Sequence, residues 1–431
     1  MKNNEKTGLG VYIVLLTGLL LLRDVVGVGV NKYVFLILAA VFMLQGSITT
    51  IIYMLIYTMP LFCGLPAAHI RLAAIAILLI KKKNLTLQQF IFPIIIILLE
   101  VIAATYYTSA SFGDVIGYLS APVMLIYLLW DEEPIDYRNC LKLFIEGFAV
   151  VCFVMVLTAL KSASSFSLIN SLQDTFRESV TQVERTEGVV IKMNANTLAY
   201  YAIVSLTITL VLYDTAKKSK SRKLWMAVTL LFMLIGVLTL SRSFILVAVF
   251  VLLLYAISKM KTVRGVFAVC SSLVIVGIIV IYLSNTIFLN LKLSLIDRFT
   301  GSNIETAGGR TEIFKAYMEA FLSNWRYMLL GSGVTDYVNV IGISKAMHNG
   351  TQQIFICMGI PGGLLFLYML FKPVAVEWEK RIPIGYWIPM IGCLLFIQTI
   401  QFLNPANLQF PFLICYYVLR AYSKQKHQIM N

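Results

Sequence analysis

Apolar runs long enough to cross a lipid bilayer follow one another along most of the chain. A spanning helix needs about 20 largely apolar residues, and breaking the sequence at charges, proline and glycine leaves about fourteen such runs. Charged residues make up only 13% of the chain, whereas a soluble domain carries roughly 25%. Most of the surface must therefore face lipid, which excludes soluble enzymes, nucleic-acid-binding proteins and disordered scaffolds. We expect an all-α polytopic membrane protein that forms one membrane domain over residues 1–431, with about 12–14 transmembrane helices.

The expected spans form two groups, separated by a long polar segment. The first group comprises residues 8–22, 29–45, 47–63, 66–80, 89–107, 115–130 and 140–160. The second group comprises residues 194–213, 224–240, 243–258, 265–284, 352–371, 384–403 and 408–421. The first run also resembles a signal peptide, but no small-residue cleavage motif closes it. We therefore take it as the first membrane helix.

The distribution of basic residues predicts the orientation of the chain. The net charge is +14, and 21 of the 35 lysines and arginines fall in segments that share one side if the N-terminus is cytoplasmic. The short loops on the other side carry very few, chiefly Arg23 and Arg242. Because cytoplasmic loops are enriched in lysine and arginine, we expect a multi-pass protein with both termini in the cytoplasm.

Two long outer loops hold most of the remaining basic residues. The first loop is residues 161–193 and the second is residues 285–351. Loops of this length inside a compact protein are usually functional or disordered. Residues 310–330 of the second loop place apolar side chains at helical spacing, which predicts an amphipathic helix on the outer membrane surface. We therefore expect the functional site on the outer face.

Two residues near span ends are candidates for chemistry. His348 lies just before a span, where an imidazole can accept a proton near neutral pH. The alternative is a capping histidine without a chemical role. Arg242 lies between two spans with almost no loop to solvate it. A charge at membrane depth costs roughly 2.5–3.5 kcal/mol on insertion scales and so normally has a partner or a ligand; the alternative is that Arg242 reaches the outer headgroups.

The long loops contribute further arginines. Arg310 follows two glycines and opens the expected amphipathic helix, although a solvated first-turn residue is the alternative. Arg177 and Arg298, one in each loop, are each followed by glycine eleven positions later. Arginine suits a diphosphate because its planar fork donates bidentate hydrogen bonds and stays protonated. Several arginines and one histidine on one face would hold a lipid diphosphate and take a proton from a hydroxyl.

Other polar residues have ordinary interpretations. We expect Arg71 and Glu100 to form an ion pair within the bundle, with a role in lipid-phosphate binding as the alternative. We expect Glu377 and Glu379 to form a solvated charge cluster rather than a metal site. Trp325, Tyr327 and Tyr337 would anchor the second loop at the headgroups rather than stack on sugars. The seven cysteines have no C-x-x-C spacing and only three histidines occur, so we expect no metal site. No Asp-x-Asp and no phosphate-binding G-x-x-x-x-G-K-[ST] motif occurs, which disfavours metal-dependent sugar-nucleotide transfer and ATP-driven transport.

Four short stretches occur in an order that carries a family resemblance. They are Lys192–Leu198, Leu240–Arg242, Gly309–Phe314 leading to Leu330–Gly333, and His348–Asn349 followed by Gly359–Gly362. In this order they resemble the O-antigen and capsular polysaccharide polymerases (Wzy-type), which are grouped with the O-antigen ligases. The resemblance covers roughly residues 190–370, and the N-terminal half is similar only in being hydrophobic.

The resemblance implies a GT-C-like glycosyltransferase of the bacterial inner membrane that uses no metal or other cofactor. It would move a growing capsule, O-antigen or exopolysaccharide chain from undecaprenyl diphosphate onto a new lipid-linked repeat unit, at the extracytoplasmic face. Arg242 and Arg310 would grip the diphosphate, Arg185 or Arg177 would contribute from the first loop, and His348 would deprotonate the acceptor hydroxyl. Neither first-loop arginine falls at a clear family position. Besides the lipid-linked oligosaccharide and the bilayer, the implied partners are a chain-length regulator and a flippase of the same pathway.

Three alternatives remain. An O-antigen ligase would need the same diphosphate grip and the same base, and would differ only in its acceptor. A flippase for the lipid-linked unit would also have many spans, but it should carry cations along a central cavity and often shows an internal repeat, which this sequence lacks. A structural or regulatory membrane protein would have no use for the arginines of the outer loops.

Overall fold

The computed structural model of the protein describes residues 3–66, 68–81, 83–107, 111–162, 171–172, 175–176, 191, 193–260, 309–403 and 409–430. Every regular element in these ranges is a helix. Seven of these helices are long and apolar enough to cross a membrane, and five shorter ones are apolar as well. The expected all-α polytopic membrane fold is thereby confirmed. The expected span at 265–284 lies outside the described residues, and each of the other expected spans coincides with a helix.

The helices of the N-terminal half run in short succession. They are α1 (Asn3–Leu21) with the π-helical turn η1 (Leu22–Val26), α2 (Lys32–Gln45), α3 (Ile48–Thr58) with η2 (Met59–Cys63), α4 (Ala68–Ile75) with η3 (Ala76–Ile80), α5 (Leu87–Tyr107), α6 (Phe112–Leu129) and α7 (Tyr137–Ser162).

The described helices of the C-terminal half include three short ones that precede a long span. They are α10 (Ala195–Thr215), α11 (Ser219–Leu238), α12 (Arg242–Lys259), α15 (Arg310–Ser323), α16 (Trp325–Leu330), α17 (Tyr337–Ile341), α18 (Gly350–Trp378), α19 (Ile384–Ile397) and α20 (Phe410–Met430).

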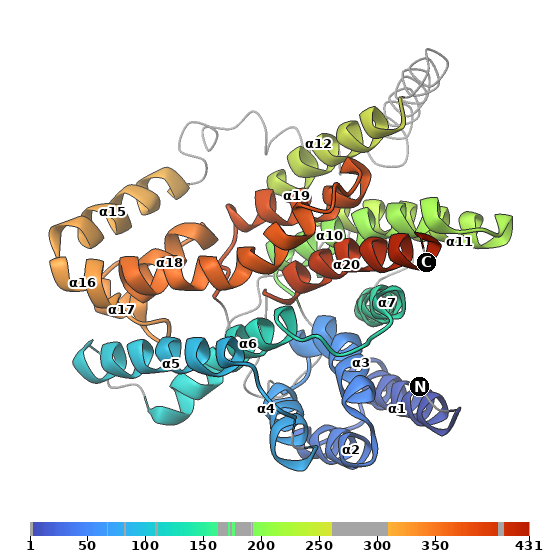
Figure 1. Ribbon diagram of the computed structural model, residues 1–431, viewed down its shortest axis with the longest axis horizontal. Helices are drawn as coiled ribbons and strands as arrows, with labels where there is room; N and C mark the ends of the chain where they lie inside the picture. Colours follow the sequence, from blue (N-terminus) through green and yellow to red (C-terminus); the bar gives the residue numbers. More distant parts are fainter. Residues whose placement is uncertain are drawn as a thin grey trace.

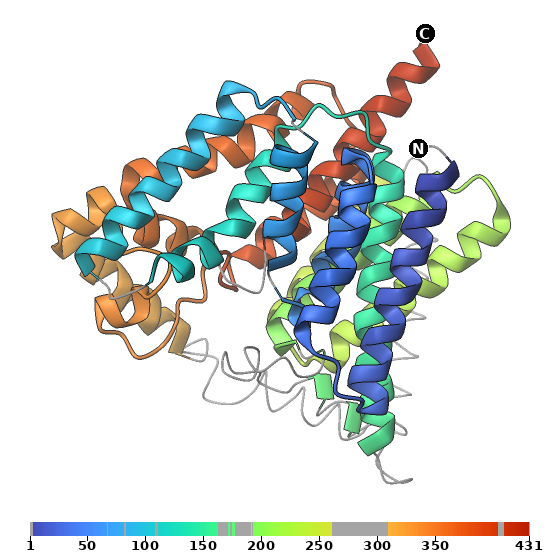
Figure 2. The same ribbon diagram turned by 90° about the horizontal axis from the view of Figure 1, so that it is seen from below.

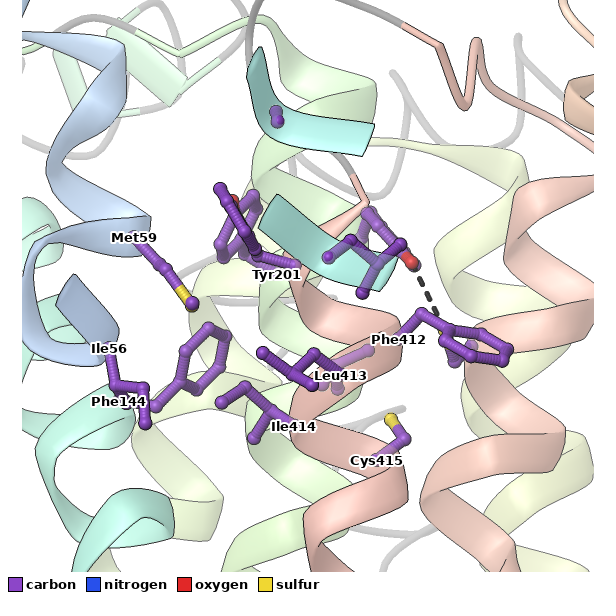
Figure 3. Packing of buried hydrophobic residues seen from close by; sticks show 14 of the residues in the cluster. Ile56, Met59, Phe144, Tyr201, Phe412, Leu413, Ile414 and Cys415 are labelled. Carbon is purple, nitrogen blue, oxygen red and sulfur yellow. Dashed lines mark hydrogen bonds between the residues drawn. The ribbon is translucent and has the colours of Figure 1, made fainter. Parts of the chain in front are cut away.

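Helix α10 lies at the centre of the bundle. It packs against α7, α11, α12, α19 and α20, and 89% of the residues in its most apolar 18-residue stretch are buried. Its Tyr201 meets Phe144 of α7, with ring centroids 5.9 Å apart, close to Leu413 of α20 (Figure 3). The hydroxyl of Thr207 donates to the carbonyl oxygen of Ile203 in its own helix, so the polar side chain is satisfied without water. The buried centre of the bundle therefore fixes the positions of the residues at the ends of these helices.

Helices α15, α16 and α17 lie together at one end of α18, and α16 also contacts α5 (Figure 1). The first helix begins and the last helix ends on the same side of the bundle (Figure 2). A chain with both termini in the cytoplasm needs this arrangement; which side is cytoplasmic stays a prediction.

The expected amphipathic helix at residues 310–330 is two helices. The break falls at Asn324, whose side-chain oxygen accepts a hydrogen bond from the backbone N–H of Arg326 (3.0 Å) and so caps α16. On α15, Tyr317 and Phe321 are buried, whereas Phe314 is 43% exposed. A local capping residue therefore ends a helix that the apolar spacing alone extends to residue 330.

Candidate functional site

Two of the stretches that carry the resemblance meet at the start of α10. Asn194 caps this helix, and its side-chain oxygen accepts from the backbone N–H of Asn196 (2.9 Å). The hydroxyl of Ser241, from the turn between α11 and α12, donates to the side-chain oxygen of Asn196 (3.2 Å). Arg242, which follows Ser241 directly, is thereby held beside the start of α10.

The turn that carries Arg242 has a restricted backbone. Leu240 is buried with φ of 51°, in the left-handed region that costs a residue other than glycine roughly 1–2 kcal/mol. The ring of Phe244 lies over Gly236, where an added Cβ would sit 2.0 Å from the ring. Only glycine fits there, so α11 and α12 can approach closely. The half-buried Arg242 is therefore presented by a tight turn at the first position of α12.

Helix α15 is fixed to the segment that carries His348. The side-chain amide of Gln352, in the first turn of α18, donates to the carbonyl oxygen of Phe314 (2.8 Å). The hydroxyl of Tyr317 donates to the carbonyl oxygen of Lys345 (2.9 Å). These two bonds hold the first turns of α15, where Arg310 lies, against the chain on either side of His348.

The first turn of α18 is held equally firmly on its other side. The side-chain amide of Gln353 donates to the carbonyl oxygen of Leu403 (3.0 Å), and its oxygen accepts from the backbone N–H of the same residue (2.8 Å). The amide of Gln398 donates to the hydroxyl of Thr351 (2.9 Å). Asn349 caps the helix by accepting from the backbone N–H of Gln352 (2.9 Å). His348 precedes this locked turn and makes no hydrogen bond or ion pair within the described part of the chain.

Arg310 lies within electrostatic range of both Arg242 and His348. Burial, with the positive charge of Arg242 as a second cause, holds the pKa of Arg310 below its ordinary value. Burial, with the positive charge of Arg310 as a second cause, lowers the pKa of His348 from its usual 6.5. Arg310 forms no ion pair with any residue in the described ranges. Arg310 therefore lies near both a second guanidinium and an imidazole that favours its neutral form, an arrangement suited to an anion next to a proton acceptor.

This arrangement predicts the titration of His348. We expect the pKa of His348 to lie below 6.5 in the wild-type protein and to rise in Arg310→Gln, because that change removes a neighbouring positive charge. Histidine NMR of isotope-labelled protein measures the pKa, and a His348→Asn spectrum identifies the resonance among three histidines. A pKa at or above 6.5 in the wild type, or no rise in Arg310→Gln, would contradict this electrostatic description.

The two glycine-containing stretches also meet each other. The backbone N–H of Ser332 donates to the carbonyl oxygen of Ile356 (2.8 Å), and that of Gly333 donates to the carbonyl oxygen of Cys357 (3.0 Å). A Cβ at Gly331, where φ is 77°, would lie 2.1 Å from the Cys357 oxygen. Gly359 interrupts α18 with φ of 70°, which frees these carbonyls for the loop. The 331–333 loop therefore packs against the kink in α18.

Glu100 of α5 fixes the continuation of that loop, and the expected Arg71–Glu100 pair is wrong. The buried carboxylate accepts from the backbone N–H of Val334 (2.8 and 2.7 Å) and of Thr335 (3.1 Å), and from the Thr335 hydroxyl (2.7 Å). Arg71 is exposed on α4 instead. Backbone amides satisfy a buried carboxylate as well as a cation does, and hydropathy cannot distinguish the two.

Two further expectations can be compared with the structure. Glu377 is fully buried and paired with Lys380 (2.7 Å) and Arg420 (3.3 Å), so the solvated cluster is wrong for this residue, although Glu379 is exposed. Tyr337 is buried against Tyr317 and is not a headgroup anchor.

The other expected site residues cannot be placed. Arg177, Arg185 and Arg298 lie outside the described residues. Within the described ranges no cluster of three or more potential metal ligands occurs; the absence of a metal requirement stays a prediction.

The residues that sequence reasoning missed are those that hold the site. They are Asn196, Ser241, Gln352 and Gln353, with Glu100 assigned to the wrong partner. One signal was available, because two adjacent glutamines at the start of an apolar span must find hydrogen-bond partners.

We expect Gln352→Leu to reduce activity far more than stability. The change removes the bond to the Phe314 carbonyl and so loosens the start of α15 relative to His348, while one hydrogen bond contributes only about 0.5–1.5 kcal/mol. Gln398→Leu is the matched control, because it breaks a bond to the same turn of α18 without touching α15. Turnover and thermal unfolding of both purified variants are the measurements. Equal activity in the two variants would show that the α15 contact does not position the site.

Comparison with known families finds a match over the part of the chain that carries these three residues. The O-antigen ligase family matches residues 225–367, which include Arg242, Arg310 and His348. A search of curated proteins finds no match to the chain. The family match supports a membrane enzyme of O-antigen or polysaccharide assembly. Over this third of its length the chain is similar to the O-antigen ligases, and its resemblance to the O-antigen ligase-like superfamily is confirmed.

Proposed function

We propose that the protein is a polysaccharide polymerase that moves a growing glycan from undecaprenyl diphosphate onto a new lipid-linked repeat unit. One observation carries the proposal: Arg242, Arg310 and His348 come from separate parts of the chain, yet the charge of Arg242 acts on Arg310 and the charge of Arg310 acts on His348. A structural role does not require two arginines to approach each other, because their repulsion costs free energy. A bound diphosphate between them would turn that repulsion into attraction.

The arginines would act on the leaving group. Arg310 and Arg242 donate hydrogen bonds to the diphosphate oxygens while the bond between the anomeric carbon and the diphosphate oxygen breaks. Negative charge grows on the diphosphate at that moment, and fixed donors in a half-buried site stabilise it without reorganising. Undecaprenyl diphosphate then leaves carrying the electron pair of the broken bond.

His348 would act on the acceptor. Its neutral imidazole takes the proton from the hydroxyl of the incoming repeat unit as the hydroxyl oxygen attacks the anomeric carbon. The lowered pKa of His348 keeps the ring neutral at physiological pH, which is the form a proton acceptor needs. Arg185, Arg177 and Arg298 are proposed as further diphosphate contacts from the two loops.

The orientation follows from the same proposal and has a simple test. The site lies on the extracytoplasmic face of a bacterial inner membrane, because lipid-linked repeat units are joined there. Ser344 is exposed in the segment before His348. A cysteine at this position, in a protein lacking other reactive cysteines, should react with an impermeant reagent added to intact spheroplasts. Reaction only after membrane disruption would reverse the orientation.

A ligase is the second candidate, because the family that matches residues 225–367 is described as O-antigen ligase. The two activities differ in the acceptor alone. Purified protein incubated with a single lipid-linked repeat unit distinguishes them. A ladder of products supports the polymerase, whereas transfer only to an added acceptor of another kind supports the ligase. No transfer to either acceptor would refute both.

A further inference from the structure

Helices α4, α5 and α6 enclose a cleft that the proposed chemistry does not use. Its volume is about 220 Å³, and α6, which packs against both α4 and α5, forms its back wall. The lining residues of α6 run from Val115 to Tyr127, a distance of roughly 18 Å at 1.5 Å per residue. This length is close to half of the hydrocarbon core, which is about 30 Å thick. The cleft therefore matches one hydrocarbon chain of one leaflet.

The walls of the cleft carry few groups that could form a hydrogen bond with water. Ile77, Ile97 and Leu119 are typical of its lining. Two of the polar side chains near them are satisfied: the amide of Gln89 donates to the Tyr127 carbonyl oxygen (3.3 Å), and the hydroxyl of Ser120 donates to a carbonyl oxygen of its own helix. The buried hydroxyl of Tyr127 is the exception, because it has no partner among the described residues. A buried water needs about three hydrogen bonds, which one free hydroxyl does not supply, so a cavity of this kind takes apolar ligands.

Among the residues that line the cleft, one is basic, and it lies at one end. Arg71, in the first turn of α4, lines the cleft, is exposed, and forms no hydrogen bond or ion pair within the described part of the chain. The start of α5, into which α4 leads, lies against Tyr127 near the end of α6, because the Gln89 amide bonds to the Tyr127 carbonyl oxygen. Val115, in the first turn of α6, therefore lies at the same end of the cleft as Arg71. This is the end where Tyr107 of α5 packs against Tyr327 of α16, with ring centroids 5.3 Å apart. Arg71 therefore lies at the level of the helices that carry the site.

We propose that this cleft binds one acyl chain of an anionic glycerophospholipid, with Arg71 contacting its phosphate. The charge and shape are complementary: a guanidinium without a partner among the described residues lies at the leaflet surface, above an apolar channel of about one leaflet's depth. A phosphate diester carries one negative charge, which one arginine balances. A polyprenyl diphosphate carries more charge and would leave part of it unbalanced here. The bound lipid would fill the gap between α4 and α5 and hold the N-terminal helices together.

The test uses full-length protein purified in detergent and supplemented with either phosphatidylglycerol or phosphatidylcholine of identical acyl chains. We expect phosphatidylglycerol to raise the thermal midpoint of the wild type by at least about 2 °C more than phosphatidylcholine does. Arg71→Gln, which removes the cation, and Ala74→Phe, which fills the cleft, should each lose this difference. The matched controls are Arg326→Gln, another exposed arginine, and Ile75→Phe, on the exposed side of α4. Both controls should keep the difference.

Native mass spectrometry with competing lipids decides the occupant. We expect one phosphatidylglycerol to remain bound to the wild type in the presence of undecaprenyl phosphate and to be lost in Arg71→Gln. Equal stabilisation by both phospholipids, or a difference that survives in Arg71→Gln, would overturn the proposal. Displacement of phosphatidylglycerol by undecaprenyl phosphate would overturn it too, because the cleft would then belong to a polyprenyl chain.

Discussion

Replacing His348 with alanine is expected to lower the rate of glycan transfer by roughly 10²–10⁴-fold, the usual share of a general base. The imidazole makes no hydrogen bond or ion pair within the described chain, so its removal should leave the helices on either side in place. Turnover of a purified lipid-linked repeat unit, measured by product ladders at several pH values, gives the size of the loss. The acid limb of the wild-type profile should lie below pH 6.5 and disappear in the variant.

Two variants make the His348 result interpretable. Asn349→Ala removes the cap of α18 and leaves the histidine, so it tests for loss through local unfolding. His427→Ala removes another histidine, near the C-terminus, and should keep wild-type activity. Full-length polymer from His348→Ala present at normal levels in the membrane would refute the proposed role of this residue.

Arg310→Ala is expected to cause the second large loss, about 10²–10³-fold in turnover, typical of removing one donor to a developing charge. Arg242→Ala should lose a similar amount. Arg310→Lys should recover only part of the activity, because lysine keeps the charge but not the bidentate geometry. Initial rates and the affinity for undecaprenyl diphosphate are the measurements.

The control for the arginine series is Arg326→Ala. Arg326 is exposed and stacks on Trp325, 5.7 Å from the ring centroid, on the neighbouring helix α16. Its loss removes the same charge from the same outer segment without touching the site. Similar losses in Arg326→Ala and Arg310→Ala would mean that net charge matters and that no specific grip exists.

The features that could be predicted from the sequence are those that depend on neighbouring residues. Apolar run length is a property of neighbouring residues, so the helices and the membrane fold followed from it. The short stretches around Arg242, Arg310 and His348 could be found because tight turns and helix starts require glycine, asparagine or serine at fixed positions. Their meeting in one region was implied by the family resemblance rather than by any spacing in the chain.

The sequence did not reveal which polar groups pair across the bundle. From the sequence we expected Glu100 to pair with a cation, whereas in the structure its carboxylate accepts hydrogen bonds from the backbone amides of Val334 and Thr335. Glu377 lies between Lys380 and Arg420, a residue 43 positions away. Such partners depend on how helices distant in sequence are placed, and many placements satisfy the same hydrophobic pattern. The break at Asn324 is a different error, because a capping side chain competed there with an uninterrupted helical periodicity.

An experimentally determined structure of the protein bound to undecaprenyl diphosphate tests the central claim most directly. We predict that the diphosphate lies between the guanidinium groups of Arg242 and Arg310, with the imidazole of His348 facing the space beside it that an acceptor sugar would enter. A diphosphate bound elsewhere, or contacts from neither arginine, would contradict the proposed site.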